Sequence, residues 1–161
     1  MAPSYTITRV ARPPAPGSGR SSPDWRALTP AAIAHFHPRS SAHRPRTSVK
    51  VLHSDEGLHV HFRVRDRYVR VAHVGFQELV SKDSCTEFFV RPGGTGGYLN
   101  FEMNAGGSLL VSFVEDWTRP LEGFRRARSL EPEWDDRIPR VHSLPERIDP
   151  EIARPVEWSI Q

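Results

Sequence analysis

The stretch TSVKVLHSDEGLHVHFRVRD (residues 47–66) decides the fold of this chain, because apolar and polar residues alternate along it. Its second half sets an apolar row against a polar row: Leu58, Val60, Phe62 and Val64 against His59, His61, Arg63 and Arg65. A period of two is typical of a β-strand with one buried face. The polar SDEG segment (residues 54–57) between the two halves predicts a tight turn. The stretch therefore predicts an antiparallel hairpin.

Two further segments follow the same design. In YLNFEMNAGGSLLVSF (residues 98–113) the alternation runs up to a Gly-Gly pair, which predicts a second hairpin turn. SKDSCTEFFVRP (residues 81–92) predicts a short strand before it, and another short strand is expected over residues 138–142. Several short strands joined by turn signals predict an all-β fold, an antiparallel, jelly-roll-like β-sandwich.

The two ends of the chain carry weaker signals. Residues 1–20 mix Pro, Gly, Ser and Arg without periodicity, which predicts a flexible N-terminal lead-in before a β-sandwich domain over residues 21–161. Thr29 and Pro30 are expected to cap and open a short helical turn. PVEWSIQ (residues 155–161) resembles a strand that is just beginning. We therefore expect the chain to be a fragment that lacks the C-terminal strands of its sandwich.

Length and composition fit one soluble domain. Of the 161 residues, 37% are hydrophobic and 25% are charged, which is typical of a globular protein. No apolar run approaches the roughly 18 residues of a membrane helix, so no membrane partner is expected. No hydrophobic leader is visible near the N-terminus, which favours a cytoplasmic or unassigned location. A single cysteine excludes an internal disulfide.

The basic charge invites a nucleic-acid interpretation. The formal net charge is only +3, however, and basic residues interleave with acids along most of the chain. The one local cluster is Arg125, Arg126 and Arg128. Because phosphate-tracking surfaces need a concentrated patch, an arginine-rich solvated surface is favoured and no nucleic-acid partner is expected.

Glu87 places a carboxylate in the middle of an otherwise apolar strand. If Phe88 and Val90 face inward, then Glu87 and Phe89 face outward. Glu87 could then share a sheet face with polar residues of neighbouring strands: Glu102, Asn100, Asn104, His61 and Arg63. Such a surface suits a ligand with many hydroxyl groups. A solvated face with cross-strand ion pairs is the alternative, and spacing alone favours it.

Two other kinds of site are weakly supported. Glu87 and Glu102 could reach the roughly 5–10 Å separation of a glycosidase pair, but the sequence shows no sign of a cleft, so no enzyme is expected. His59 and His61 have a spacing that some metal sites use, yet no third ligand is evident, and exposed histidines are favoured.

Several segments, in order, resemble the family 9 carbohydrate-binding modules and their family 9-like relatives. The motifs are Asp24-Trp25, the 47–66 hairpin ending at Asp66, DSCTEFFVRP (residues 83–92), YLNFEMNAGG (residues 98–107) and PVEWSIQ. The resemblance implies an antiparallel β-sandwich that binds an oligo- or polysaccharide, often beside a glycoside hydrolase in carbohydrate catabolism. It also implies a calcium ion in some members.

The resemblance makes Glu87 the first candidate for holding a sugar. The other candidates are its expected neighbours and the most available aromatic platform: Asp83, Arg63, Asn100, Glu102 and Trp117. Where the family has its first stacking tryptophan, this chain has ELVSK (residues 78–82), without an aromatic residue. The alternative is a β-sandwich that serves as a protein-interaction or scaffold domain without a sugar ligand.

Overall fold

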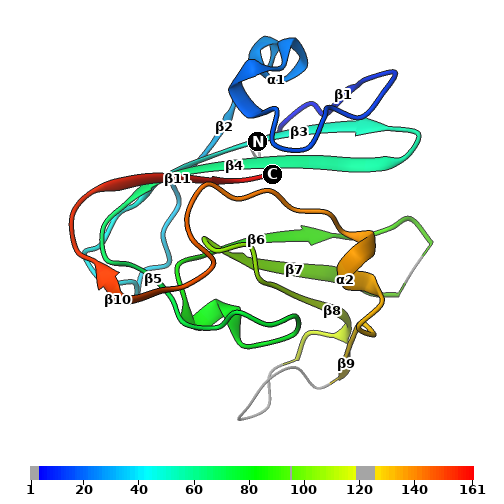
Figure 1. Cartoon of the computed structure of the whole chain (residues 1–161). Helices are drawn as coiled ribbons and strands as arrows, with labels where there is room; N and C mark the ends of the chain where they lie inside the picture. Colours follow the sequence, from blue (N-terminus) through cyan, green and yellow to red (C-terminus); the bar gives the residue numbers. More distant parts are fainter. Residues whose placement is uncertain (1–3, 95, 119–125) are drawn as a thin grey trace. The chain divides into compact units, whose positions relative to one another are not determined.

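The computed structural model describes residues 4–94, 96–118 and 126–161 (Figure 1). The chain divides into two compact units, which are described separately. The first comprises Met1–Tyr68, Arg140–Leu144 and Ile152–Gln161, and the second comprises Val69–Pro139 and Pro145–Glu151. Strands dominate both units, and nearly all of their pairings are antiparallel. The prediction of an all-β fold built from antiparallel sheets is confirmed.

The first unit is built on the predicted hairpin. Its sheet runs in the order β1-β3-β4-β11, with β2 also paired to β3. The strands are β1 (Thr8–Arg9), β2 (Ala31–Ile33), β3 (Arg46–Ser54), β4 (Gly57–Asp66) and β11 (Val156–Ile160). β1 runs parallel to β3, and the other pairings are antiparallel. The hairpin expected from residues 47–66 is therefore confirmed as β3 and β4.

Alternation along these strands builds the core of the first unit. Phe62 and Val64 of β4 are buried, and they lie directly opposite Ile160 and Trp158 of β11. Val51 of β3 is buried as well, and its position in the register places it on the same face. The apolar row of the sequence therefore faces the core at Phe62 and Val64, whereas Leu58, beside the hairpin turn, is exposed.

The helical turn expected at Pro30 is wrong. The structure places a short helix, α1 (Pro23–Ala27), one residue after the 3-10 helix η1 (Gly19–Ser21), and Pro23 occupies the start of α1. A proline at that position loses no hydrogen bond, because the first N–H groups of a helix have no partner within it. The residues after Pro30 instead form β2, because pairing with β3 satisfies their backbone groups.

The second unit carries the sheet β6-β7-β8-β9 and a separate pair, β5 with β10. The strands are β5 (Val69–Val71), β6 (Cys85–Val90), β7 (Tyr98–Asn104), β8 (Leu109–Asp116), β9 (Arg126–Ser129) and β10 (Ile148–Ile152). Its short helices are η2 (Val80–Lys82) and α2 (Trp134–Arg137). β7 and β8 confirm the second predicted hairpin. The strand expected over residues 138–142 is reduced to a single bridge from His142 to Ile160, within the first unit.

The β7–β8 turn is held by one buried side chain. Asn104 Oδ1 accepts hydrogen bonds from the backbone N–H groups of Gly106 (3.2 Å) and Ser108 (3.0 Å). Gly107 has φ +89°, a conformation that glycine adopts without steric cost. The Gly-Gly pair thus closes the hairpin that brings β7 and β8 into register. None of the helices in the described residues is long and apolar enough to cross a membrane.

Candidate functional site

The pairing of β6 with β7 brings the predicted polar residues onto one sheet face. Glu87 lies directly opposite Glu102, and Phe89 lies directly opposite Asn100. β8 continues the same sheet beside β7 (Figure 1). Residues directly opposite each other in an antiparallel pair point to the same side. We call this surface the Glu87 face and define it as Glu87, Phe89, Tyr98, Asn100 and Glu102.

Side-chain burial along β6 follows the predicted alternation. Glu87 and Phe89 are exposed, whereas Phe88 and Val90 are half-buried on the other face. The prediction that Glu87 faces outward is confirmed. The carboxylate in the middle of the strand therefore does not lie in an apolar core.

An exposed aromatic ring stands beside Glu87. The side chain of Phe89 is 53% exposed, and its ring meets that of Tyr98 edge-to-face with centroids 5.8 Å apart. Trp117 follows the end of β8 and is 60% exposed. The Arg91 guanidinium carbon lies 6.0 Å from the centre of the Trp117 ring. The chain therefore offers aromatic surface on this strand and after β8.

Asn100 and Glu102 form a polar pair on β7. Asn100 Nδ2 donates a hydrogen bond of 2.8 Å to Glu102 Oε1. Asn100 itself is only 3% exposed. Within the described residues, Asn100 Oδ1 and Glu102 Oε2 are buried and have no hydrogen-bond partner. Buried acceptors are normally satisfied, so these two oxygens are exceptions among the described residues.

The pKa of the Cys85 thiol is affected by the negative charges on this face. Burial raises its pKa, and the negative charges of Glu87 and Glu102 raise it further. Both carboxylates therefore act on the same side of the sheet, where they favour neutral donors or cations over anions. Cys85 is a free thiol held in its neutral form.

Asp83 lies in a different environment from Glu87. Its side chain is fully buried and accepts hydrogen bonds from the N–H groups of Ala72 (3.0 Å) and His73 (2.9 Å). Asn104 Nδ2 donates a third bond of 3.0 Å, and the His73 ring contacts the same carboxylate at 3.2 Å. Burial alone would raise the Asp83 pKa, but the backbone and side-chain hydrogen bonds outweigh it and leave the pKa lowered.

The hydrogen bond between Asp83 and Asn104 thus joins the motif DSCTEFFVRP (residues 83–92) to the motif YLNFEMNAGG (residues 98–107). This bond ties the segment before β6 to the end of β7. The structure gives Asp83 a framework role, and its contact with sugar remains a prediction that its burial does not favour.

Arg63 belongs to the other unit. It lies on β4, and its Nη2 donates a hydrogen bond of 2.6 Å to Glu157 of β11. β4 and β6 belong to different sheets, so Arg63 and Glu87 do not share a sheet face. The face expected to hold His61 beside Glu87 is corrected for the same reason.

The histidines of β4 are not the exposed pair that was expected. His61 is 7% exposed and packs edge-on against Trp25, with ring centroids 5.5 Å apart. Burial lowers its pKa, and the nearby positive charge of Lys50 lowers it further. Within the described ranges, no three His, Cys, Asp or Glu side chains come together as metal ligands. No residues here are assigned to calcium.

The sequence placed Glu87, Asn100 and Glu102 on one face and Phe89 outward beside them, but Phe89 was not named as a candidate site residue. The signal was present, because a phenylalanine in the outward register of an alternating strand is exposed apolar surface. Tyr98 gave no such signal, since its contact with Phe89 depends on the pairing of β6 with β7.

Comparisons with known proteins agree with this architecture. The model of the family "Carbohydrate-binding family 9" matches residues 25–160. A solved structure of a "putative carbohydrate-binding protein" from Bacteroides uniformis matches with a TM-score of 0.81 and 24% sequence identity, over 96% of this chain and 68% of that one. At that identity the likeness establishes the fold alone. Comparison with curated proteins finds no match. Because the family model covers most of its length, the chain belongs to carbohydrate-binding family 9.

Proposed function

We propose that the Glu87 face binds a saccharide and performs no chemistry on it. The observation that carries this proposal is the exposed ring of Phe89 beside the exposed carboxylate of Glu87. A sugar ring presents an apolar C–H face and several hydroxyl donors. An aromatic ring packs against the C–H face, and a carboxylate accepts hydrogen bonds from the hydroxyl groups.

The buried pair on β7 supports the same ligand class. Asn100 Oδ1 and Glu102 Oε2 are acceptors without partners in the described residues. They have almost no exposed area, so a ligand hydroxyl group or a bridging water molecule would reach them only after neighbouring side chains move. The arrangement is rich in acceptors, which suits a neutral ligand with many hydroxyl donors.

Trp117 extends the aromatic surface. Its ring is 60% exposed, and Arg91 stacks near it. A second sugar unit would pack on this ring while the first contacts Phe89. The family's name supports a carbohydrate ligand. We extend this to a proposed role for the whole module, which is to hold a glycoside hydrolase on its polysaccharide, as the resemblance implies.

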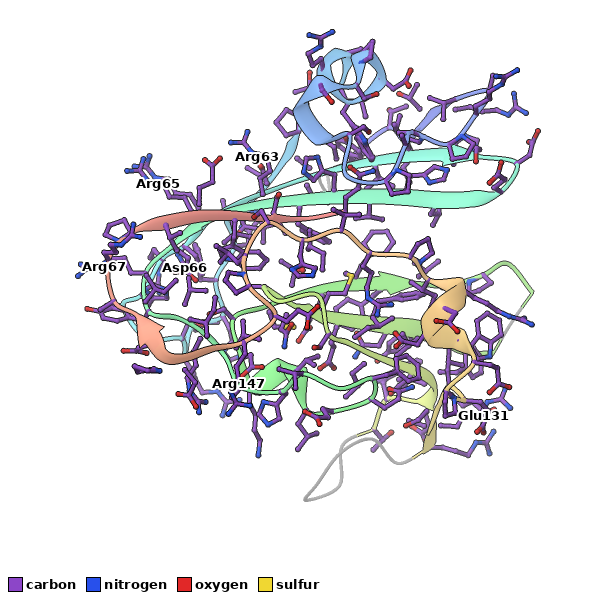
Figure 2. The ribbon with its side chains drawn as sticks, in the orientation of Figure 1. Arg63, Arg65, Asp66, Arg67, Glu131 and Arg147 are labelled. Atoms are coloured by element: carbon purple, nitrogen blue, oxygen red, sulfur yellow. The ribbon has the colours of Figure 1, made fainter. Side chains whose placement is uncertain are left out.

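Calorimetric titration with xylo- and cello-oligosaccharides, with and without calcium, tests the proposal. Glu87→Ala should weaken binding at least tenfold, because hydrogen bonds to a charged group contribute about 1.5–3 kcal/mol each. Phe89→Ala should weaken binding through loss of the stacking surface. Glu131→Ala is the matched control, since it removes an exposed glutamate elsewhere in the second unit (Figure 2).

Three outcomes would count against the proposal. Unchanged affinity in both Glu87→Ala and Phe89→Ala would remove this face from the site. Absence of binding by a chain that melts cooperatively would favour the interaction or scaffold domain. Release of shorter oligosaccharides would show that the carboxylate pair of Glu87 and Glu102 acts catalytically.

A further inference from the structure

Four arginines gather around one hollow in the first unit. The hollow has a volume of about 380 Å³ and lies where β3 begins, β4 ends and β11 begins. Its arginines are Arg44, Arg46, Arg65 and Arg67, and we call it the arginine hollow. Its volume falls within the range of small-ligand sites. It contains none of the residues of the Glu87 face.

The strand register forces two of these arginines together. Arg46 and Arg65 are directly opposite each other across β3 and β4. Cβ atoms in such a pair lie about 5 Å apart, and like charges there oppose folding. Neither arginine forms an ion pair within the described residues. Glu157 lies opposite Arg65 on β11, but its carboxylate accepts a hydrogen bond from Arg63 instead. The repulsion between the two guanidinium groups is therefore left without a balancing acid.

The other two arginines are positioned without being neutralised. Arg44 donates hydrogen bonds to the carbonyl oxygens of Ser41 and His43, and its guanidinium lies 4.6 Å from the centre of the Phe36 ring. Arg67 Nε donates to the carbonyl oxygen of Ala153 at 3.3 Å. Carbonyl groups and aromatic rings carry no net charge. Each guanidinium has five N–H donors, so several remain for a ligand.

The acid that lines the hollow is already occupied. Asp66 accepts hydrogen bonds from His43 Nε2 (2.6 Å) and from the backbone N–H of Arg67 (2.7 Å), and its side chain is 11% exposed. Figure 2 shows Arg63 and Arg65 on one side of β4 and Asp66 on the other. The Asp66 carboxylate therefore contributes one negative charge to the hollow, and its hydrogen bonds go to His43 and the Arg67 backbone, not to Arg46 or Arg65.

We propose that the arginine hollow binds an oxyanion, a carboxylate or sulfate group carried by an acidic saccharide. Guanidinium forks match the two oxygens of such a group with paired hydrogen bonds. The choice of a saccharide as carrier rests on the proposed function, whereas the anion site rests on the geometry of the hollow. A nucleic acid would need phosphate contacts along an extended basic track, and the arginines gather at a single hollow.

The test is a titration of the full chain with tri-galacturonic acid, with xylotriose as the neutral counterpart. Arg46→Gln and Arg65→Gln should each weaken binding of the acidic sugar at least tenfold and leave binding of xylotriose within twofold. Arg147→Gln is the matched control, because it removes one exposed arginine from the second unit and changes the net charge equally. Binding should also weaken as sodium chloride rises from 50 to 500 mM.

The outcomes separate this proposal from the previous one. The anion site would be overturned if Arg46→Gln and Arg65→Gln bound tri-galacturonic acid as tightly as the original chain does. It would also be overturned if the original chain did not bind tri-galacturonic acid at millimolar concentration. Tighter binding of a single-stranded oligonucleotide through the same arginines would overturn the choice of a saccharide. Loss of xylotriose binding in Glu87→Ala, with the acidic sugar unaffected, would support both sites. Failure of xylotriose to bind at all would count against the Glu87 face alone.

Discussion

Replacing Asp83 with Ala removes a buried carboxylate that accepts hydrogen bonds from two separate segments, residues 72–73 and Asn104. The backbone N–H groups of Ala72 and His73 and the side-chain amide of Asn104 all donate hydrogen bonds to it. Alanine removes the acceptor of both backbone N–H groups and of one Asn104 amide N–H, in a place where the Asp83 side chain has no exposed area. Asn104 Nδ2 keeps its bond of 2.7 Å to the His73 carbonyl oxygen. A buried donor left unsatisfied costs about 1–3 kcal/mol.

Three such donors, taken near the lower end of that range, give a loss of about 4 kcal/mol in the free energy of unfolding. That is a large share of the roughly 5–15 kcal/mol that stabilises a typical domain. For a chain of this length the melting temperature should fall by about 8–16 °C. Glu131→Ala, which removes an exposed carboxylate, should change stability by less than about 0.5 kcal/mol.

Urea unfolding at several pH values provides the assay. The Asp83 pKa is lowered in the folded state, so its ionised form contributes stability that is fully present above the unfolded-state pKa, near 4. That contribution is lost as the pH falls through the lower, folded-state pKa. The difference between the original chain and Asp83→Ala should therefore be constant from pH 5 to 7 and shrink below about pH 4.

A loss of less than about 1 kcal/mol at pH 7 would refute this reasoning, because it would mean that the three donors find water or other acceptors. A variant that keeps its stability and loses saccharide binding would show that Asp83 touches the ligand.

Three further predictions follow from burial and charge. The thiol of Cys85 should react with alkylating reagents at pH 8 far more slowly in the folded chain than in the chain unfolded by urea. The reason is that burial and the charge of Glu87 raise the pKa of the thiol in the folded chain. Equal reaction rates in the two states would contradict this prediction. Trp158→Ala should lower the free energy of unfolding by about 3–5 kcal/mol, measured by urea titration, because it leaves a cavity in the core; a loss below 1 kcal/mol would argue against a packed ring. Arg46→Gln should leave the melting temperature unchanged or slightly higher, since it relieves repulsion from Arg65, and a fall of several degrees would show that the pair is stabilising.

Local alternation made much of the fold predictable. Both hairpins and the outward direction of Glu87 follow from a period of two, which depends only on neighbouring residues. Trp158 follows the same rule, because it alternates with Val156 and Ile160 in a short run and is 2% exposed.

Pairings between distant segments had no local signal. β10 pairs with β5, and β11 pairs with β4, across about half of the chain. The burial of Asp83 depends on such contacts, since a polar residue beside Lys82 and Ser84 resembles a solvated turn in the sequence. His61 was expected to be exposed and is buried, because Trp25 comes from the N-terminal segment to cover it.

The arginine hollow was hidden for a similar reason. Its arginines come in two pairs that lie about twenty residues apart, and each pair sits among residues of mixed polarity. Only the register of β3 with β4 sets Arg46 against Arg65. The net charge of the chain does not reveal this cluster, because acids elsewhere in the sequence offset its positive charges. The cluster forms only when β3 and β4 pair in this register.

The hydrogen bond between Asp83 and Asn104 has a practical consequence for protein engineering. It fastens the scaffold of the second unit with side chains that are buried, while Glu87 and Phe89 project from β6 without taking part in that linkage. Randomising these outward positions in a display library would sample new recognition surfaces on an unchanged frame. Selection for another ligand could then proceed without repeated loss of folded clones.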